Sequence, residues 1–306
     1  MSNIEISSIT AIVVTYNRIE LLRKCISALL QQTAPLKRII IIDNASGDGT
    51  EEAFSNIVDS RILYVRLPNN TGGAGGFAAG IQHAVELSDS WLWLMDDDAC
   101  PCLNAAEELV AVAKNPNNIY GSLAVFGKYT SWTTTLIEQG RATNLANEVP
   151  KEAYVESMPF LGFLVHRNLV DKIGLPDADY FIAADDMEYC VRAHRAGARI
   201  VLAGNSHIEH PRTQQQIINV LGVNITYLSL PPWKRYYDTR NRLLIARKYY
   251  GIQLFTKAIP GTLVRLVAAL LREPKKLAQL RAFAAGIFDG LAGLKGKRHI
   301  RWGISP

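Results

Sequence analysis

The stretch Trp91-Leu92-Trp93-Leu94-Met95-Asp96-Asp97-Asp98 decides the fold class, because a short apolar run ends in three consecutive carboxylates. An apolar run of this length predicts a buried strand. Three carboxylates at its end repel one another near pH 7 unless a positive group lies among them. In open α/β sheets, ligands bind at the carboxyl ends of the strands. The stretch therefore predicts either a solvated acidic turn or a site for a divalent cation carrying a phosphorylated ligand.

The three aspartates are expected to point in different directions. Side chains alternate along an extended segment, so Asp96 and Asp98 would face one way and Asp97 the other. This assignment holds only if the strand continues through Asp98 without a bend.

The rest of the N-terminal half alternates between strand-like runs and helical periodicity, which predicts a mostly parallel α/β sheet with helices on both faces. Expected strands cover 9–16, 38–42 and 61–67, and expected helices cover 20–32, 50–57 and 77–87, with a glycine-rich loop over 68–76. Further on, helices are expected over 104–113, 186–196 and 231–250, and strands over 119–129, 132–136, 154–165 and 199–202.

The bulk composition indicates a globular protein. Of 306 residues, 48% are apolar and 20% are charged, which excludes a disordered chain. We expect no transmembrane helix, because no segment reaches 18 uncharged apolar residues. The N-terminus has no basic region followed by an apolar core, so no signal peptide is expected. The four cysteines have no zinc spacing and are expected to be free thiols in a reducing cytosol.

The charge is distributed unevenly along the chain. From Trp233 to Pro306 there are 16 Lys and Arg against three acids, a net of +13, while the rest carries 17 basic and 25 acidic residues, a net of −8. A basic C-terminal segment predicts an anionic partner. Its cations are interleaved with apolar residues, as in helices that lie on anionic membranes, although a packed helix with a solvated basic face fits equally. No recognition motif supports nucleic-acid binding.

One glycine motif suggests a different function. Residues 73–78, Gly-Ala-Gly-Gly-Phe-Ala, match a dinucleotide-binding fingerprint, and Asp96 follows about 20 residues later. That fingerprint normally belongs to the first strand–helix unit, whereas two units precede it here. An NAD-dependent oxidoreductase is therefore kept only as an alternative.

Several polar segments at expected strand ends could line one crevice. Thr15-Tyr16-Asn17-Arg18 ends the first strand, and Asp43-Asn44-Ala45-Ser46 ends the second. Asp43 can accept hydrogen bonds from a base or ribose. The segment 69–73, Asn-Asn-Thr-Gly-Gly, can bring its backbone close to a ligand, since glycine has no Cβ.

Together, the segments AIVVTYNR, IIIIDNASGDGT, NNTGGAGGFAAG and WLWLMDDDA resemble family-2 glycosyltransferases of the GT-A fold. Within that family, the doubled glycines and the DDDA form look most like galactofuranosyltransferases. The resemblance covers roughly residues 9–250. It implies an α/β nucleotide-sugar domain over 1–228 and a basic, helical C-terminal region over 229–306.

The resemblance also implies which residues hold the donor and a metal ion. Donor contacts are expected from Thr15, Tyr16, Asn17, Arg18, Asp43, Asn70, Gly73, Asp96 and Asp97, with Asp97 at the sugar. Asp96, Asp98 and His207 would bind Mn²⁺ or Mg²⁺ as a mixed oxygen and nitrogen set. His210, three residues on, is the competing position, and a histidine pair can also be purely structural.

In the segment 184–188, Ala-Asp-Asp-Met-Glu, the family's catalytic base maps to Asp186. An inverting transfer needs a base to remove the acceptor hydroxyl proton. From the residues alone, these acids could simply favour a helix N-terminus. The segment 236–241, Tyr-Tyr-Asp-Thr-Arg-Asn, also resembles the family, and Arg240 either reaches a phosphate or packs inside a helix.

The expected activity is metal-dependent, inverting transfer from UDP-galactofuranose to a cell-surface glycan or lipid-linked saccharide, as in polysaccharide or lipopolysaccharide synthesis. The enzyme is expected in the cytoplasm, peripheral on the inner face of the cell membrane. The alternatives are a rhamnosyltransferase using dTDP-rhamnose, the oxidoreductase above, and a non-catalytic carbohydrate- or membrane-binding module.

Overall fold

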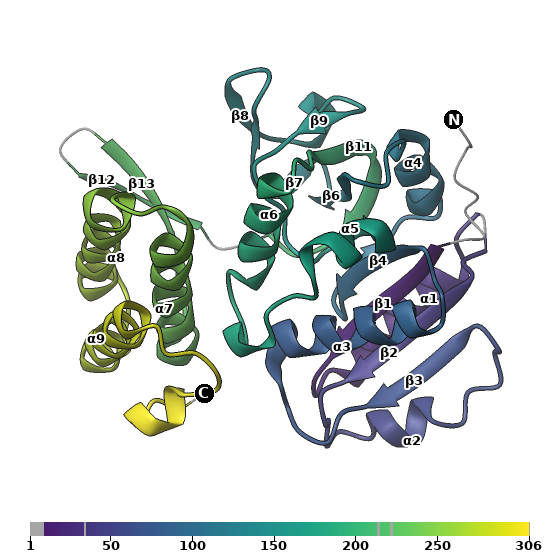
Figure 1. Cartoon of the computed structure of the whole chain (residues 1–306), viewed down its shortest axis with the longest axis horizontal. Helices are drawn as coiled ribbons and strands as arrows, with labels where there is room; N and C mark the ends of the chain where they lie inside the picture. Colours follow the sequence, from purple (N-terminus) through teal and green to yellow (C-terminus); the bar gives the residue numbers. More distant parts are fainter. Residues whose placement is uncertain (1–8, 34, 213–214, 221–222, 306) are drawn as a thin grey trace. The chain divides into compact units, whose positions relative to one another are not determined.

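The computed structural model describes residues 9–33, 35–212, 215–220 and 223–305. The chain divides into two compact units (Figure 1). The first comprises residues 1–177 and 189–212, and the second comprises 178–188 and 213–306. The expected domain boundary at residue 228 stays a prediction. In the structure, the short segment 178–188 groups with the C-terminal residues in the second unit.

The first unit is built on an eleven-stranded sheet whose long path runs β3-β2-β1-β4-β10-β6-β11-β5. The pairs among β3, β2, β1 and β4 are parallel, and β6 is parallel to β11. Strand β10 pairs antiparallel with β4 and β6, and β5 pairs antiparallel with β11. The strands are β1 (Ile9–Thr15), β2 (Arg38–Asp43), β3 (Ile62–Arg66), β4 (Trp91–Asp96), β5 (Cys100–Pro101), β6 (Ile119–Phe126), β7 (Tyr129–Leu136), β8 (Arg141–Leu145), β9 (Ala153–Tyr154), β10 (Phe163–His166) and β11 (Ile200–Glu209).

Helices cover both faces of this sheet, as expected. One apolar cluster joins the sheet to α3, and the other joins its opposite face to α1 and α4. Strand side chains alternate between these clusters: Ile12 and Val14 lie in the first, and Ala11 and Val13 in the second. The helices are α1 (Ile19–Leu30), α2 (Thr50–Phe54), α3 (Gly72–Glu86), α4 (Ala105–Val112), α5 (Arg167–Ile173) and α6 (Asp185–Arg195), with a 3₁₀ turn η2 (Ala146–Glu148).

The expected glycine-rich loop over 68–76 is wrong at its C-terminal end, because α3 already begins at Gly72. The glycines let this helix approach the sheet closely. A Cβ on Gly76 would lie 2.5 Å from Val14 Cγ1, and one on Gly80 would collide with Ile12. Because the glycines lie inside the helix, they do not form the turn that a dinucleotide fingerprint places before it. The oxidoreductase alternative is therefore unsupported.

The second unit contains a group of helices and a β-hairpin, visible as separate elements in Figure 1. Helix α9 packs against both α7 and α8. Pro260 lies in the first turn of α8, where a proline is tolerated. The elements are η3 (Ala178–Tyr180), β12 (Gln215–Val220), β13 (Val223–Leu228), α7 (Pro232–Tyr249), η4 (Leu254–Ala258), α8 (Ile259–Arg272), α9 (Lys276–Ala292) and η5 (His299–Trp302).

Candidate functional site

Three adjacent parallel strands of the first unit end side by side in polar residues. Their register pairs Thr15 with Asp43, and Val14 with Asp96. The strand ends that the sequence indicated therefore form one continuous edge of the sheet. This is the edge where open α/β sheets bind their ligands.

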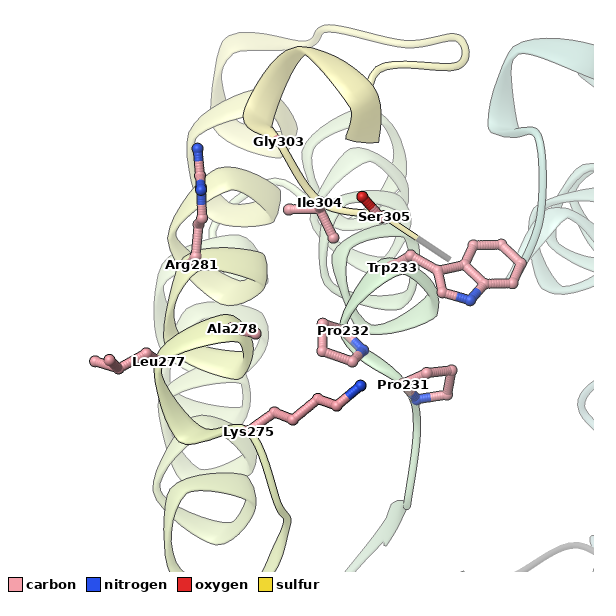
Figure 2. A pocket seen from close by; sticks show the side chains of 10 residues that line it. All are labelled: Pro231, Pro232, Trp233, Lys275, Leu277, Ala278, Arg281, Gly303, Ile304 and Ser305. Carbon is pink, nitrogen blue, oxygen red and sulfur yellow. The ribbon is translucent and has the colours of Figure 1, made fainter.

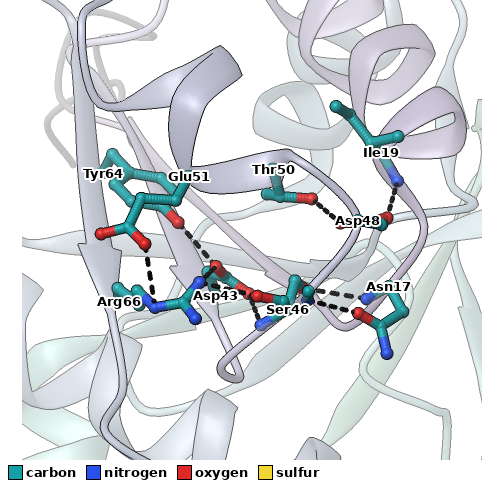
Figure 3. Close-up of polar contacts among 10 residues, drawn as sticks. Asn17, Ile19, Asp43, Ser46, Asp48, Thr50, Glu51, Tyr64 and Arg66 are labelled. Atoms are coloured by element: carbon teal, nitrogen blue, oxygen red, sulfur yellow. Dashed lines mark hydrogen bonds and ion pairs between the residues drawn. The ribbon is translucent and has the colours of Figure 1, made fainter.

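Asp43 lies at the centre of a buried hydrogen-bond network (Figure 3). Its Oδ1 accepts from the Ser46 backbone N–H at 2.9 Å. Its Oδ2 accepts from the Tyr64 hydroxyl at 2.6 Å and from the Arg66 guanidinium at 3.0 Å. Burial, followed by the carboxylate of Asp43, raises the pKa of Tyr64, so the phenol stays a donor. The side chain of Asp43 thus orients Ser46, Tyr64 and Arg66 at the end of β2.

The sequence interpretation missed Tyr64 and Arg66, although a signal existed. The two residues are spaced by two along β3, so their side chains share one face, and β3 pairs with β2. Arg66 also lies 3.3 Å from Glu51 and donates to the Ser46 carbonyl at 2.8 Å. Its charge is therefore shared among acceptors at this edge.

The loops that follow β1 and β2 are tied to each other through Asn17. Its backbone N–H donates to Ser46 Oγ at 2.9 Å, and its side-chain Oδ1 accepts from the Gly47 N–H at 2.7 Å (Figure 3). Asn17 has a φ of 53°, a left-handed conformation that asparagine tolerates better than most residues. Next to it, the Tyr16 side chain is 45% exposed and free to contact a ligand.

The segment 69–73 includes the N-terminus of α3 and lies in the first unit. Asn70 Oδ1 accepts from the Gly72 N–H at 2.8 Å, and Asn44 accepts from the Thr71 N–H at 3.1 Å. These bonds hold the first turn of α3 against the end of β2. A Cβ on Gly73 would meet open space, so this position tolerates a close neighbour.

The aspartate triplet does not follow simple strand alternation. Strand β4 ends at Asp96, and a turn follows in which the Ala99 N–H donates to the Asp96 carbonyl at 3.2 Å. The extended geometry assumed for Asp97 and Asp98 is therefore wrong.

Asp97 is buried and held by two residues from the end of β1. Its Oδ2 accepts from Thr15 Oγ1 at 2.8 Å, and its Oδ1 accepts from Arg18 at 3.2 Å. Burial raises the pKa of Asp97, and Thr15 and Arg18 oppose this rise. Arg18 also donates to Asp98 at 3.1 Å, so a half-exposed guanidinium bridges both carboxylates. This is the positive group that the triplet required.

Asp98 faces His210 rather than the expected His207. The distance from Asp98 Oδ1 to His210 Nε2 is 3.7 Å, and the His210 ring lies edge-on to Trp132. His207 instead directs Nε2 to the Gly204 carbonyl at 2.9 Å. A register shift between Ala203 and His207 in the pairing of β11 with β6 accounts for this difference, because it displaces β11 just before the histidines.

Among the described residues, no group of three or more His, Cys, Asp or Glu side chains is arranged to hold a metal ion. The predicted ligands Asp96, Asp98 and His207 are therefore not gathered into one cluster, and the metal set stays a prediction. Asp98 Oδ1 is buried and has no hydrogen-bond partner among the described residues, and His210 Nε2 is the ring atom that faces it.

The predicted base, Asp186, belongs to the second unit and lies in the first turn of α6. Its Oδ1 accepts from the Met187 N–H at 2.6 Å. Burial raises the pKa of Asp186, and the Met187 bond and the Arg242 charge oppose the rise. Asp185 beside it is buried, and burial followed by the neighbouring Asp186 raises its pKa to about 8. The two carboxyls therefore titrate as a pair that retains a proton to higher pH than an ordinary aspartate does.

The loop before Asp185 has an unusual backbone that α7 holds in place. Phe181, Ala183 and Ala184 all have positive φ angles, between 60° and 68°. Asn241 Nδ2 donates to three carbonyls of this loop, those of Tyr180, Ile182 and Ala183, at 2.7–3.0 Å. Left-handed residues other than glycine cost free energy, and these bonds offset that cost.

Arg240 supports the same loop and does not reach a phosphate. Its buried guanidinium donates to the carbonyls of Asp179, Tyr180 and Gly296 at 2.6–3.1 Å. Tyr236 and Tyr237 are also fully buried, with hydroxyls bonded to Asp289 and His299. The packing alternative for this segment is therefore the one observed.

We expect Asp185→Asn to stabilise the protein at neutral pH. The unfolded chain releases the Asp185 proton near its ordinary pKa, whereas the folded protein retains it to higher pH. Stability is thus present below the ordinary pKa and falls as pH rises towards the raised one. The substitution should raise Tm at pH 7.5 by about 2–4 °C per kcal/mol gained, with the gain vanishing near pH 4.

The matched control for this measurement is Asp171→Asn, which changes an exposed carboxylate of α5. Thermal unfolding of both variants from pH 4 to 8 measures the difference. A Tm gain for Asp185→Asn that is the same at every pH would contradict the buried, proton-retaining carboxyl.

Comparison with known proteins identifies the family to which the chain belongs. The family model described as "Glycosyl transferase family 2" matches residues 10–166. The galactofuranosyltransferase GlfT1 of Mycolicibacterium smegmatis is 27% identical over 252 residues, which cover 76% of this chain and 81% of that protein. The dTDP-rhamnosyl transferase RfbF of Shigella flexneri is 21% identical over 300 residues, which cover 95% and 97% of the two chains.

A solved structure shares the fold. The crystal structure of GalNAc-T7 with UDP, GalNAc and Mn²⁺ superposes with a TM-score of 0.60 at 12% identity. The match covers 97% of this chain but only 58% of that one. The mostly parallel sheet with its helical C-terminal region is therefore the GT-A glycosyltransferase fold. The family match includes β1, β2, α3 and the aspartate triplet, and the chain belongs to glycosyl transferase family 2.

Proposed function

We propose that this glycosyltransferase moves galactofuranose from UDP-galactofuranose to a glycan or lipid-linked saccharide, with inversion at the anomeric carbon. The observation that carries the donor site is the alignment of Thr15, Asp43 and Asp96 at the ends of three adjacent strands. The likeness to GlfT1 supports the choice of sugar. The site of action is proposed to be the cytoplasmic face of the cell membrane, in polysaccharide or lipopolysaccharide synthesis.

In the proposed reaction, Asp186 removes the proton from the acceptor hydroxyl as its oxygen bonds to the anomeric carbon. The bond from that carbon to the diphosphate oxygen breaks on the opposite side, and UDP leaves with the electron pair. An α-linked donor therefore gives a β-linked product. The raised pKa of Asp186 suits this role, since a base works best when its pKa approaches the working pH.

The proposal includes a divalent cation, Mn²⁺ or Mg²⁺, with Asp96 and Asp98 as oxygen ligands and either His207 or His210 as the nitrogen ligand. The orphaned Oδ1 of Asp98 beside His210 supports His210. A full cluster of protein ligands is not required, because such ions are commonly held by one or two carboxylates plus substrate phosphates. When bound, the cation supplies positive charge against the departing diphosphate.

The two histidines give different expected results. His210→Ala should weaken Mn²⁺-dependent UDP binding about tenfold, the usual loss for a group that supports a metal site. His207→Ala should leave that binding within about twofold, since His207 faces a backbone carbonyl. Isothermal titration of UDP with and without Mn²⁺ measures both. A larger loss for His207→Ala than for His210→Ala would favour His207 as the ligand. UDP binding that EDTA leaves unchanged would exclude a role for the metal ion.

The likeness to RfbF over nearly the whole chain supports a second candidate, transfer of rhamnose from dTDP-rhamnose. A donor panel with purified enzyme and a set of synthetic saccharide acceptors separates the two. UDP release only with UDP-galactofuranose supports the first proposal. Turnover with dTDP-rhamnose instead would replace the sugar while keeping the mechanism, and hydrolysis without transfer would contradict both.

A further inference from the structure

The surface of the C-terminal helices is more basic than the sequence count implies. All three side-chain carboxylates from Trp233 to Ser305 are buried and paired inside the unit. The pairs are Asp238 with Arg242, Glu273 with Arg235, and Asp289 with Arg298. Nine cations of the same segment are exposed, namely Arg247, Lys248, Lys257, Arg272, Lys275, Lys276, Arg281, Lys297 and Arg301. The three acids of the segment are therefore internal. Lys248 is paired with Glu188 at 3.1 Å, and the surface of the segment carries an excess of cations.

The same unit exposes apolar side chains along one face of a helix. Phe255, Leu263, Val267 and Leu271 are separated by four or eight residues and are between 48 and 71% exposed. The helical run Leu254–Arg272 has a mean hydropathy of 1.6 and is long and apolar enough to cross a membrane by length and composition alone. Its opposite face is packed within the unit: Thr262, Ala268 and Ala269 are buried there. A helix packed on one side and apolar on the other suits the plane of a membrane interface.

A pocket of about 340 Å³ lies between the start of α7, the start of α9 and the segment 303–305 (Figure 2). Lys275 and Arg281 supply its charge, and Trp233 supplies an amphipathic ring. Figure 2 shows Lys275 directing its ammonium group towards Pro231 and Pro232, whereas the Arg281 side chain is directed away from them. Leu277 lines the rim and is 85% exposed, so apolar surface borders the pocket. Exposed cations next to exposed apolar surface suit phosphate headgroups and their acyl chains.

We propose that the C-terminal unit docks on an anionic lipid bilayer, with the exposed cations Lys275 and Arg281 at lipid phosphates and the stripe from Phe255 to Leu271 in the interface. The charge attracts the anionic surface, and the apolar side chains enter it. This docking goes beyond the transfer reaction and does not depend on the donor sugar.

The apolar stripe distinguishes a membrane from a nucleic acid. A nucleic acid would be held mainly by phosphate contacts, to which exposed aliphatic side chains contribute little. A bilayer uses both features at once, since each cation near an anionic surface and each buried apolar group adds to binding. Variants of the stripe are therefore expected to lose binding to vesicles and to keep any binding to oligonucleotides.

The test is co-sedimentation of the full chain with vesicles of phosphatidylcholine alone or with 30% phosphatidylglycerol. We expect binding only to the anionic vesicles. Lys275→Gln/Arg281→Gln should weaken the partition coefficient about 30-fold, at about fivefold per cation. Leu263→Ser/Val267→Ser should weaken it by at least about tenfold. The matched control Lys24→Gln/Lys151→Gln removes two exposed cations of the first unit and should change it less than about threefold.

Two further measurements make each outcome decisive. Circular dichroism and transfer to a water-soluble acceptor show that the variants are folded and that the reaction is independent of docking. Equal losses for the Lys275/Arg281 pair and the control pair would overturn the role of these two cations, and full binding by the stripe variant would overturn interfacial insertion. Binding of a single-stranded oligonucleotide without vesicle binding would overturn the proposal in favour of a nucleic acid.

Discussion

Asp186→Asn is expected to lower kcat for sugar transfer by about 10³-fold while leaving UDP affinity unchanged. A positioned general base contributes about 10²–10⁴-fold, and an amide of the same shape cannot accept the acceptor proton. The Met187 N–H can still donate to the amide oxygen, so the first turn of α6 should persist. Steady-state transfer with UDP-galactofuranose measures kcat, and UDP titration measures donor affinity.

The pH profile provides an independent check on the role of Asp186. The base acts when ionised, so activity falls as pH drops through its pKa. Because burial raises the pKa of Asp186, the acid limb of kcat should lie above the range of an ordinary carboxylate. Asp171→Asn, in an exposed position of α5, is the control and should retain the wild-type profile. Transfer by Asp186→Asn within threefold of wild type would remove Asp186 from the mechanism.

The donor edge of the sheet was predictable from sequence because its signals are local. Apolar runs of strand length ended in polar residues three times, and parallel pairing then placed Thr15, Asp43 and Asp96 together. The bend after Asp96 was not predictable. A turn bonded through a backbone carbonyl leaves no distinctive pattern in side-chain types, so Asp97 and Asp98 were assigned to the wrong geometry.

Other features depend on packing between residues far apart in the chain. Gly76 looks like a loop residue by propensity, yet its missing Cβ atom allows α3 to pack on β1. Arg240 looks like a phosphate ligand by charge, yet it bonds loop carbonyls about 60 residues earlier. Each case is a tertiary contact overriding a local preference, and single-sequence patterns carry no information about it.

The loop that carries the proposed base leads to the second large effect, expected for Asn241→Leu. Leucine has a similar volume but cannot donate hydrogen bonds, so the carbonyls of Ile182 and Ala183 lose their Asn241 donor. The Tyr180 carbonyl also loses Asn241 but keeps its bond from Arg240. Each buried acceptor left without a partner costs about 1–3 kcal/mol. The positive φ angles of Ala183 and Ala184 then lose the contacts that offset their strain. With two carbonyls left without a donor, we expect a free energy of unfolding lower by about 2–6 kcal/mol.

A loss of stability alone would not show that Asn241 positions Asp186, so a control with equal structural damage is needed. Gln279→Leu removes another buried amide of the second unit, which donates to the Leu230 carbonyl at 2.9 Å and to Glu273. Both variants should melt earlier, but only Asn241→Leu should lower kcat, by about 10²-fold below its melting range, with KM for the donor unchanged. Asn241→Gln should restore part of this loss, because an amide retains the donors. Equal kcat values for the two leucine variants would mean that Asn241 stabilises the fold without placing the base, since the loop would then present Asp186 correctly without its three hydrogen bonds.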